Sequence, residues 1–192
     1  MLGGIGKIYL YPDKNEAHYA ITDKESLRIL INLVLSQYSL LTDHQYQRFT
    51  RLHKVLLDNI VRFDTLKEFN LFRASVVPVV TPIASMIYYV SNWIVGFING
   101  EGSFPIDGVC SFTLEHTDQS VLVMMREHLG FEAKLYDRTT RKTTYMLQIS
   151  SRADTTKLVN FLDANIALKG NKLLQYNVWR EAWSKKDEGT LE

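Results

Sequence analysis

Glu101 has the residue type and the placement of a metal-binding carboxylate. It closes the apolar segment 93–104, in which glycines recur four residues apart at Gly96 and Gly100. Residues four apart lie on one face of a helix, so two glycines there let a second helix approach almost backbone to backbone. A carboxylate in the last turn faces the negative end of the helix dipole, where a bound cation offsets its charge. The segment therefore predicts a close helix pair that presents a metal-binding carboxylate at its end.

The two ends of this helix can also be placed from the sequence. Ser91 or Asn92 can cap its start, and Gly102 can end it with a backbone at positive φ. The spacing alone also fits a simpler interpretation, in which a core helix ends at a glycine cap and Glu101 is merely exposed. On spacing alone, that simpler interpretation is the more common case.

The segment 93–104 reads W-I-V-G-F-I-N-G-E-G-S-F and resembles the signature of the LAGLIDADG homing endonucleases and intron maturases. The common form of that signature is W-h-x-G-F-h-D-x-E-G-S-F, so Asn99 stands where Asp is commoner. The resemblance implies two motif helices, one from each of two αββαββα repeats, at the centre of a saddle-shaped α+β fold. It also implies that Glu101 binds a divalent metal, Mg²⁺, at a scissile phosphate.

An internal duplication supports two related halves. Residues 2–9 align with 129–136 and residues 41–45 with 168–172 at the same offset, and both copies share the order of turn, strand, strand and helix. The first copy lacks a motif helix and a first hairpin. We therefore expect a partial ββα-type repeat at 1–72, a linker at 73–90, a complete αββαββα repeat at 91–184 and a polar tail at 185–192.

Periodicity and capping residues place the elements of each half. In the first half, a hairpin precedes three helices, which Asp23, Thr42 and Thr65 can open. In the second half, the motif helix is followed by strands near 103–108 and 110–116, a helix at 118–129, strands near 132–138 and 143–150, and helices near 153–163 and 170–183.

Strand alternation predicts a surface that could contact DNA. If Leu135, Leu147 and Ile149 face the helices, then the alternate residues of the same strands, including Met146 and Gln148, face outward. An antiparallel ribbon fits the major groove, where Arg, Lys and Gln can address base edges. Without the family resemblance, an ordinary solvated strand face explains the alternation better. The predicted DNA-binding residues are Lys7, Tyr9, Tyr11, His18, Lys134, Tyr136, Arg138, Arg141, Lys142 and Gln148.

Two further residues are candidates for the cleavage centre. The resemblance places Lys172 where many family members have a basic residue that stabilises charge or positions water, whereas the equivalent in the first copy is Gln45. Gln148 could lie near the same centre on the outward strand face. The candidate catalytic residues are therefore Glu101, Lys172 and Gln148.

Composition excludes several other classes of protein. The 192 residues carry a net charge of +1, so any nucleic-acid binding must come from local clusters of Lys and Arg. One cysteine rules out an internal disulfide and gives no cysteine-based metal site. The uncharged run near 74–100 is long enough to span a membrane, but Pro78, Pro82 and its polar residues argue against that interpretation. We therefore expect no membrane partner.

The resemblance implies a metal-dependent, site-specific double-strand DNA endonuclease, or a large fragment of one. Because each DNA strand needs a carboxylate and this chain supplies one, a second motif helix from another chain or a second copy is implied. The alternative is a group I intron maturase, which would bind RNA without cleaving DNA, and a third possibility is a remnant that binds neither. The resemblance further implies an organellar location, the mitochondrial matrix.

Overall fold

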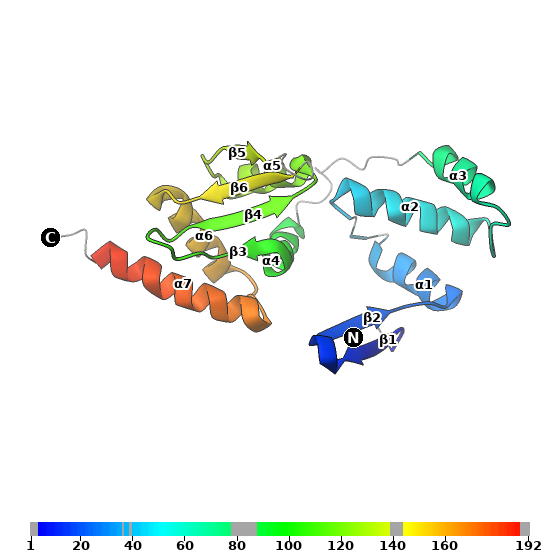
Figure 1. Cartoon of the computed structure of the whole chain (residues 1–192), viewed down its shortest axis with the longest axis horizontal. Coiled ribbons are helices and arrows are strands. Elements are labelled where there is room, and N and C mark those ends of the chain that lie inside the picture. The colour runs from blue at the N-terminus through cyan, green and yellow to red at the C-terminus, as the bar shows by residue number, and fades with distance from the viewer. Residues whose placement is uncertain (1–3, 36, 39, 78–87, 139–143, 189–192) are drawn as a thin grey trace. The chain divides into compact units, whose positions relative to one another are not determined.

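The computed structural model divides the chain into two units, residues 1–86 and 87–192 (Figure 1). It describes residues 4–35, 37, 38, 40–77, 88–138 and 144–188. The division falls inside the segment 73–90 that the sequence predicts as a linker, and residues 78–87 of that segment lie outside the described residues. A helix continues through Ser75, so the ordered part of the first unit extends slightly beyond its predicted end.

The first unit begins with the predicted β-hairpin. Strands β1 (Lys7–Tyr11) and β2 (Glu16–Ala20) pair in an antiparallel register that sets Tyr9 opposite His18. A 3-10 turn over Pro12–Lys14 joins them, and Asn15 takes the left-handed conformation with φ 52°, which Asn adopts more readily than most residues. The proline and asparagine therefore explain why the chain reverses here.

Three helices follow the hairpin: α1 (Lys24–Leu30), which continues into a π-helical turn at Ile31–Leu35, α2 (Asp43–Leu57) and α3 (Leu66–Ser75). Asp23 accepts a hydrogen bond from the Ser26 amide, and Thr65 accepts one from the Glu68 amide, so two of the predicted caps are confirmed. Thr42 precedes α2, but its side chain makes no capping hydrogen bond.

The second unit has the element order αββαββα, followed by one more helix. Its elements are α4 (Val90–Glu101), β3 (Gly102–Ser103), β4 (Phe112–His116), α5 (Gln119–Leu129), β5 (Leu135–Asp137), β6 (Tyr145–Ile149), α6 (Arg152–Ala164) and α7 (Gly170–Glu188). The strands form one antiparallel sheet in the order β3-β4-β6-β5. This order confirms the predicted α+β class and the αββαββα repeat.

Helices cover one face of this sheet, because α4 packs on β3 and β4 while α5 packs on β4 and β6. The inward residues of the strands, including Leu114, Leu147 and Ile149, are fully or almost fully buried, as the alternation predicts. Ile94 and Ile98 of α4 are also fully buried. Removing this apolar surface from water is the main stabilising contribution to the unit.

Helix α7 is fixed to α6 by a small polar cluster. The Tyr176 hydroxyl donates to the Asp163 carboxylate at 3.0 Å, and Arg180 donates to the other oxygen of the same carboxylate. Burial raises the pKa of the Tyr176 phenol, and the neighbouring Asp163 carboxylate raises it further, so the phenol remains a donor. The middle of α7 is thereby held against the end of α6.

Several predicted boundaries are corrected by the structure, and the strand expected near 103–108 covers only Gly102–Ser103. Helix α4 begins at Val90 after Tyr89, without a side-chain cap, so Ser91 and Asn92 lie inside the helix and do not cap it. Helix α7 continues to Glu188, so the first residues of the predicted polar tail 185–192 are helical, and 189–192 lie outside the described residues. None of the helices in the described ranges is long and apolar enough to cross a membrane.

Candidate metal and nucleic-acid site

Glu101 is the last residue of α4, and its side chain is exposed. Within the part of the chain that the structure describes, its carboxylate forms no hydrogen bond or ion pair. A carboxylate at a helix C-terminus is disfavoured by the helix dipole. A cation bound at this position would offset that unfavourable charge.

Gly102 follows Glu101 and differs from the prediction. Its φ is −67°, so it is extended and not left-handed, and the predicted positive-φ cap is wrong. The glycine is needed for space instead, because a Cβ there would lie 2.7 Å from the Ile98 carbonyl oxygen and 2.9 Å from the Phe112 ring. The chain can turn directly from α4 into β3 only without a side chain at this position.

Gly102→Ala is expected to destabilise the second unit by about 1–3 kcal/mol, because the Ile98 carbonyl and the Phe112 ring must move. Gly96→Ala is the matched control, since a Cβ at Gly96 meets nothing within 4 Å. Alanine should stabilise that helix by about 0.5–1 kcal/mol. Chemical denaturation of both variants measures the difference, and equal stability of the two would contradict the packing role of Gly102.

Lys172 lies near the start of α7 and points back to the end of α4. Its ammonium group donates a hydrogen bond to the carbonyl oxygen of Gly102, the residue after Glu101, and another to Gln175 at 3.2 Å. The Asn99 side chain joins α4 to the residue just before α7, because its oxygen accepts from the Lys169 amide at 2.7 Å. The structure thus brings one cation of α7 to the backbone beside Glu101.

Gln148 lies on the sheet face that the helices do not cover. Gln148 is exposed on β6 and stands opposite Thr113 of β4. Thr113 in turn stands opposite Ser103 of β3. Ser103 is two residues after Glu101, so Gln148 shares a cross-strand row with the end of the motif. Its place in the sheet is consistent with the predicted location near a cleavage centre.

The glycine face of α4 is open in the second unit. Asn92, Gly96 and Gly100 follow one another at four-residue spacing and are all exposed, and nothing lies within 4 Å of a Cβ built at either glycine. Trp93 and Phe97 flank this stripe with their rings stacked 4.7 Å apart. The stripe is therefore a smooth surface on which a second helix could pack closely.

The outer sheet face of the second unit carries the predicted DNA-binding residues. Lys134, Tyr136 and Arg138 are exposed at and beside the edge strand β5. Met146 lies on the same sheet face, between its cross-strand neighbours Tyr136 and Glu115. It is nevertheless buried, so the prediction that its side chain is open to solvent is wrong. Arg141 and Lys142 lie outside the described residues.

Glu115 on this face was missed by the sequence analysis. Its carboxylate accepts from the Thr144 hydroxyl at 2.8 Å and lies 3.9 Å from the Arg138 guanidinium. An exposed ion pair of this kind contributes about 0–1 kcal/mol, so a phosphate could recruit Arg138 at small cost. Finding Glu115 requires the pairing of β4 with β6, which places it beside Met146 on the outer sheet face. The sequence alone indicates that pairing only approximately.

The hairpin of the first unit presents its four predicted residues together. Lys7, Tyr9 and Tyr11 lie on one face of β1, with His18 opposite Tyr9, and all four are exposed. The Tyr11 and His18 rings are 4.9 Å apart, and His18 contacts Glu16 at 3.2 Å. The opposite face of the hairpin carries Ile8 and Leu10, which are also exposed.

The donors available to a metal ion are few. Among the described residues, no group of three or more His, Cys, Asp or Glu side chains could enclose a metal. Mg²⁺ in nucleotide and nucleic-acid sites commonly takes one or two carboxylates and completes its shell with water and phosphate oxygens. An exposed single carboxylate at Glu101 fits that kind of shared site and does not fit an enclosed structural one.

Comparison with known proteins gives relatives in sequence. No family model matches the chain. The probable intron-encoded endonuclease Cox1-I1b of Schizosaccharomyces pombe is 26% identical over 200 residues, which cover 95% of this chain and 51% of that protein. The probable intron-encoded endonuclease 4 of Neurospora crassa is 30% identical over 98 residues, covering 49% of this chain and 18% of that protein. The chain thus spans about half the length of the curated relative that it matches almost throughout.

Solved structures show the fold. The LAGLIDADG homing endonuclease I-GzeII, in complex with its DNA target, matches 98% of this chain and 75% of its own with a TM-score of 0.75 at 16% identity. I-SmaMI, bound to an uncleaved DNA target in the presence of calcium ions, matches 100% of this chain and 76% of its own with a TM-score of 0.74 at 18% identity.

Proposed function

Because this chain has the fold of the LAGLIDADG homing endonucleases and resembles intron-encoded endonucleases in sequence, we propose that it is a site-specific double-strand DNA endonuclease, or a large fragment of one. The single observation that carries this proposal is the junction of α4 and β3. There an exposed carboxylate at Glu101 stands beside an uncovered sheet face with basic and polar side chains. This combination suits a duplex laid on the sheet with one phosphate at the end of the helix.

The residues at the junction have separate roles in the proposed reaction. Glu101 supplies the carboxylate that would hold a divalent cation such as Mg²⁺, which when bound activates water and neutralises the leaving oxygen. Lys172 would stabilise negative charge on the phosphate or orient water from its place beside Gly102. Gln148 could position water or a phosphate from the open sheet face. The calcium ions named with I-SmaMI support a divalent cation, and the choice of Mg²⁺ is part of the proposal.

The proposed enzyme needs a second carboxylate for the second DNA strand. The open stripe of Asn92, Gly96 and Gly100 is where a second motif helix, from another chain or a second copy, would pack. Close packing there would set the second carboxylate next to Glu101. Double-strand cleavage is thereby tied to assembly on this helix.

The maturase alternative is not favoured by the comparisons. The curated relatives are named as probable intron-encoded endonucleases, and the structures of I-GzeII and I-SmaMI compared above are complexes with DNA. Binding to group I intron RNA remains an outcome that the experiment below can detect. We also propose a location in the mitochondrial matrix, for which the intron-encoded relatives are the support.

The experiment measures binding of the chain to a randomised duplex library and to intron RNA over a range of salt concentrations. Lys134→Ala and Arg138→Ala are each expected to weaken duplex binding and reduce the salt slope by about 1, because each removes one phosphate-neutralising cation. Lys185→Ala is the control, since that lysine is on α7 and pairs with Glu181. Tighter binding to RNA than to any duplex, or slopes that do not change, would contradict the proposal.

A further inference from the structure

The edge strand β5 is short for a strand that is proposed to read DNA. It has three residues, and within the described residues it pairs with β6 alone, with Tyr136 opposite Met146 at its centre. A shift of one residue in a strand moves every side chain to the other face. Something besides this short ladder must therefore fix where Tyr136 stands.

The lead-in segment 130–134 provides the first part of that restraint. Gly130 ends α5 in the left-handed conformation with φ 67°, which glycine adopts without strain. The Phe131 amide donates to the Arg126 carbonyl at 2.9 Å, and the Phe131 side chain is buried. The start of the segment is thus fixed to the end of α5.

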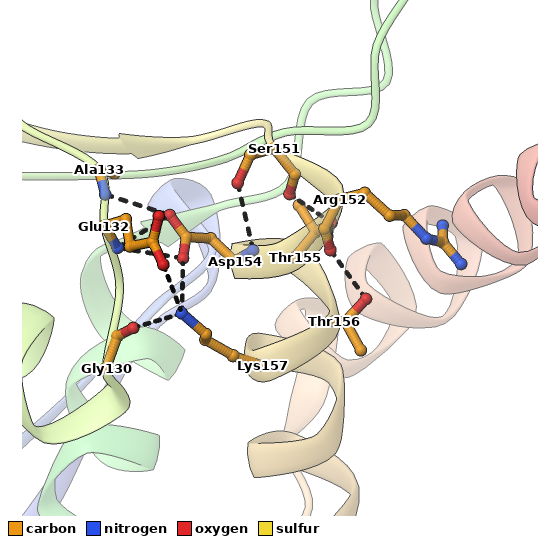
Figure 2. A network of polar contacts seen from close by, with 9 residues as sticks. All are labelled: Gly130, Glu132, Ala133, Ser151, Arg152, Asp154, Thr155, Thr156 and Lys157. Carbon is orange, nitrogen blue, oxygen red and sulfur yellow. Dashed lines mark hydrogen bonds and ion pairs between the residues drawn. The ribbon is translucent and has the colours of Figure 1, made fainter.

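Asp154 holds the middle of the lead-in segment. Its carboxylate accepts from the Glu132 amide at 3.1 and 3.2 Å and from the Ala133 amide at 3.1 Å, and only 2% of the residue is exposed (Figure 2). These residues lie just before β5, and of two consecutive amides only one would face β6 if the ladder continued toward its start. The amide of Asp154 itself donates to the capping residue Ser151 at 3.2 Å, which fixes Asp154 in the first turn of α6.

Lys157, one turn further along α6, holds the carbonyl side of the same segment. Its ammonium group donates to the Gly130 carbonyl at 2.6 Å and to the Asp154 carboxylate at 3.3 Å (Figure 2). The Asp154 carboxylate accepts hydrogen bonds from backbone amides, and the Lys157 ammonium donates one to a backbone carbonyl. Each side chain thus has the polarity that its backbone partner requires. Two side chains of one helix turn thus clamp the segment that leads into β5.

We propose that Asp154 and Lys157 are positioning residues for β5, and that they set part of the target specificity without touching DNA. The clamp fixes where Lys134, Tyr136 and Arg138 stand along the duplex. This inference rests on the proposed function, because it assigns the clamp a role in DNA recognition. A carboxylate is required at Asp154, since an asparagine would turn its NH₂ group toward an amide donor or toward the ammonium.

The test uses the full chain and two measurements. In the first, hydrogen exchange followed by NMR reports the Glu132 and Ala133 amides without any DNA. In the second, a randomised duplex library is selected on the wild type and on each variant, and discrimination is scored at each base pair. Tyr136→Ala marks the base pairs that β5 reads. Thr156→Ala is the matched control, because its hydroxyl bonds only to the Arg152 carbonyl within α6.

Asp154→Asn is expected to speed exchange of these amides, by about tenfold or more for an amide that faces the NH₂ group, because asparagine keeps only one of the two acceptor oxygens. It should lower discrimination about tenfold at the base pairs marked by Tyr136→Ala and leave the other positions unchanged. Lys157→Met should give a smaller loss of discrimination at the same base pairs. If Asp154→Asn does not fold, this variant provides the test. Thr156→Ala should match the wild type.

Two results would overturn the inference. One is faster amide exchange with an unchanged selection profile, which would make the clamp a structural feature alone. The other is an even loss at all positions. If the wild type selects no sequence while the exchange result holds, then it is the proposed function that fails, and the role in specificity fails with it.

Discussion

Glu101→Gln is expected to abolish DNA cleavage while leaving the fold and DNA binding in place. Glutamine keeps the size of the side chain but cannot supply the negative charge that holds a divalent cation. Loss of the metal's charge stabilisation is worth several kcal/mol, or roughly 10³-fold in rate. The same change should stabilise the second unit by about 0.3–1 kcal/mol, because it removes a carboxylate from the negative end of α4. Single-turnover cleavage, duplex binding and thermal unfolding measure the three effects.

A matched control separates this role from a general effect of charge. Glu127→Gln removes a carboxylate from an exposed position near the end of α5 and should leave the cleavage rate unchanged. Cleavage by Glu101→Gln at the wild-type rate would refute the assignment of the metal-binding carboxylate. A large loss of duplex binding with the same variant would show instead that Glu101 positions the DNA.

Gly96→Leu is expected to stabilise the isolated second unit and yet to prevent assembly and cleavage. Leucine has a higher helix propensity than glycine by about 0.5–1 kcal/mol, and nothing lies within 4 Å of a Cβ at this position. The added side chain would hold a second helix away from the glycine stripe. Sedimentation of the wild type should show an oligomer, and the variant should sediment as a monomer.

The control for added apolar surface is Asn160→Leu, which places the same side chain on an exposed position of α6. It should leave the oligomer and the cleavage rate as they are in the wild type. A wild-type chain that is a stable monomer and still cuts both strands would rule out assembly through α4. Cleavage retained by Gly96→Leu would do the same.

Much of the second unit could be predicted because its signals are local. The alternation around Leu147 gave the correct buried face of β6, and Asp118 caps α5 as its position before an apolar helix indicates. The resemblance of the motif supplied the order of elements and the place of Glu101. Capping and periodicity involve residues a few positions apart, and these are the relations that a sequence displays directly.

The predictions that failed depend on contacts between distant residues. The strand expected near 132–138 begins only at Leu135, because the amides of Glu132 and Ala133 donate to Asp154 from another helix. The sequence predicts a positive φ at Gly102, whereas the structure needs glycine there because a Cβ would collide with the Phe112 ring. No local sequence pattern indicates that Glu132 will contact the Asp154 carboxylate 22 residues away, or that Gly102 will contact the Phe112 ring on the next strand.

The end of α4 gives four consecutive residues four different tasks. Asn99 holds the start of α7, Gly100 stays bare, Glu101 points to solvent and Gly102 fits where a side chain cannot. Inserting or deleting one codon within the helix before them would turn all four by about 100° relative to the preceding turns. A frame-preserving change of one codon in that stretch is therefore expected to disturb all four positions at once, whereas the exposed loop at 106–109 leaves room for such changes.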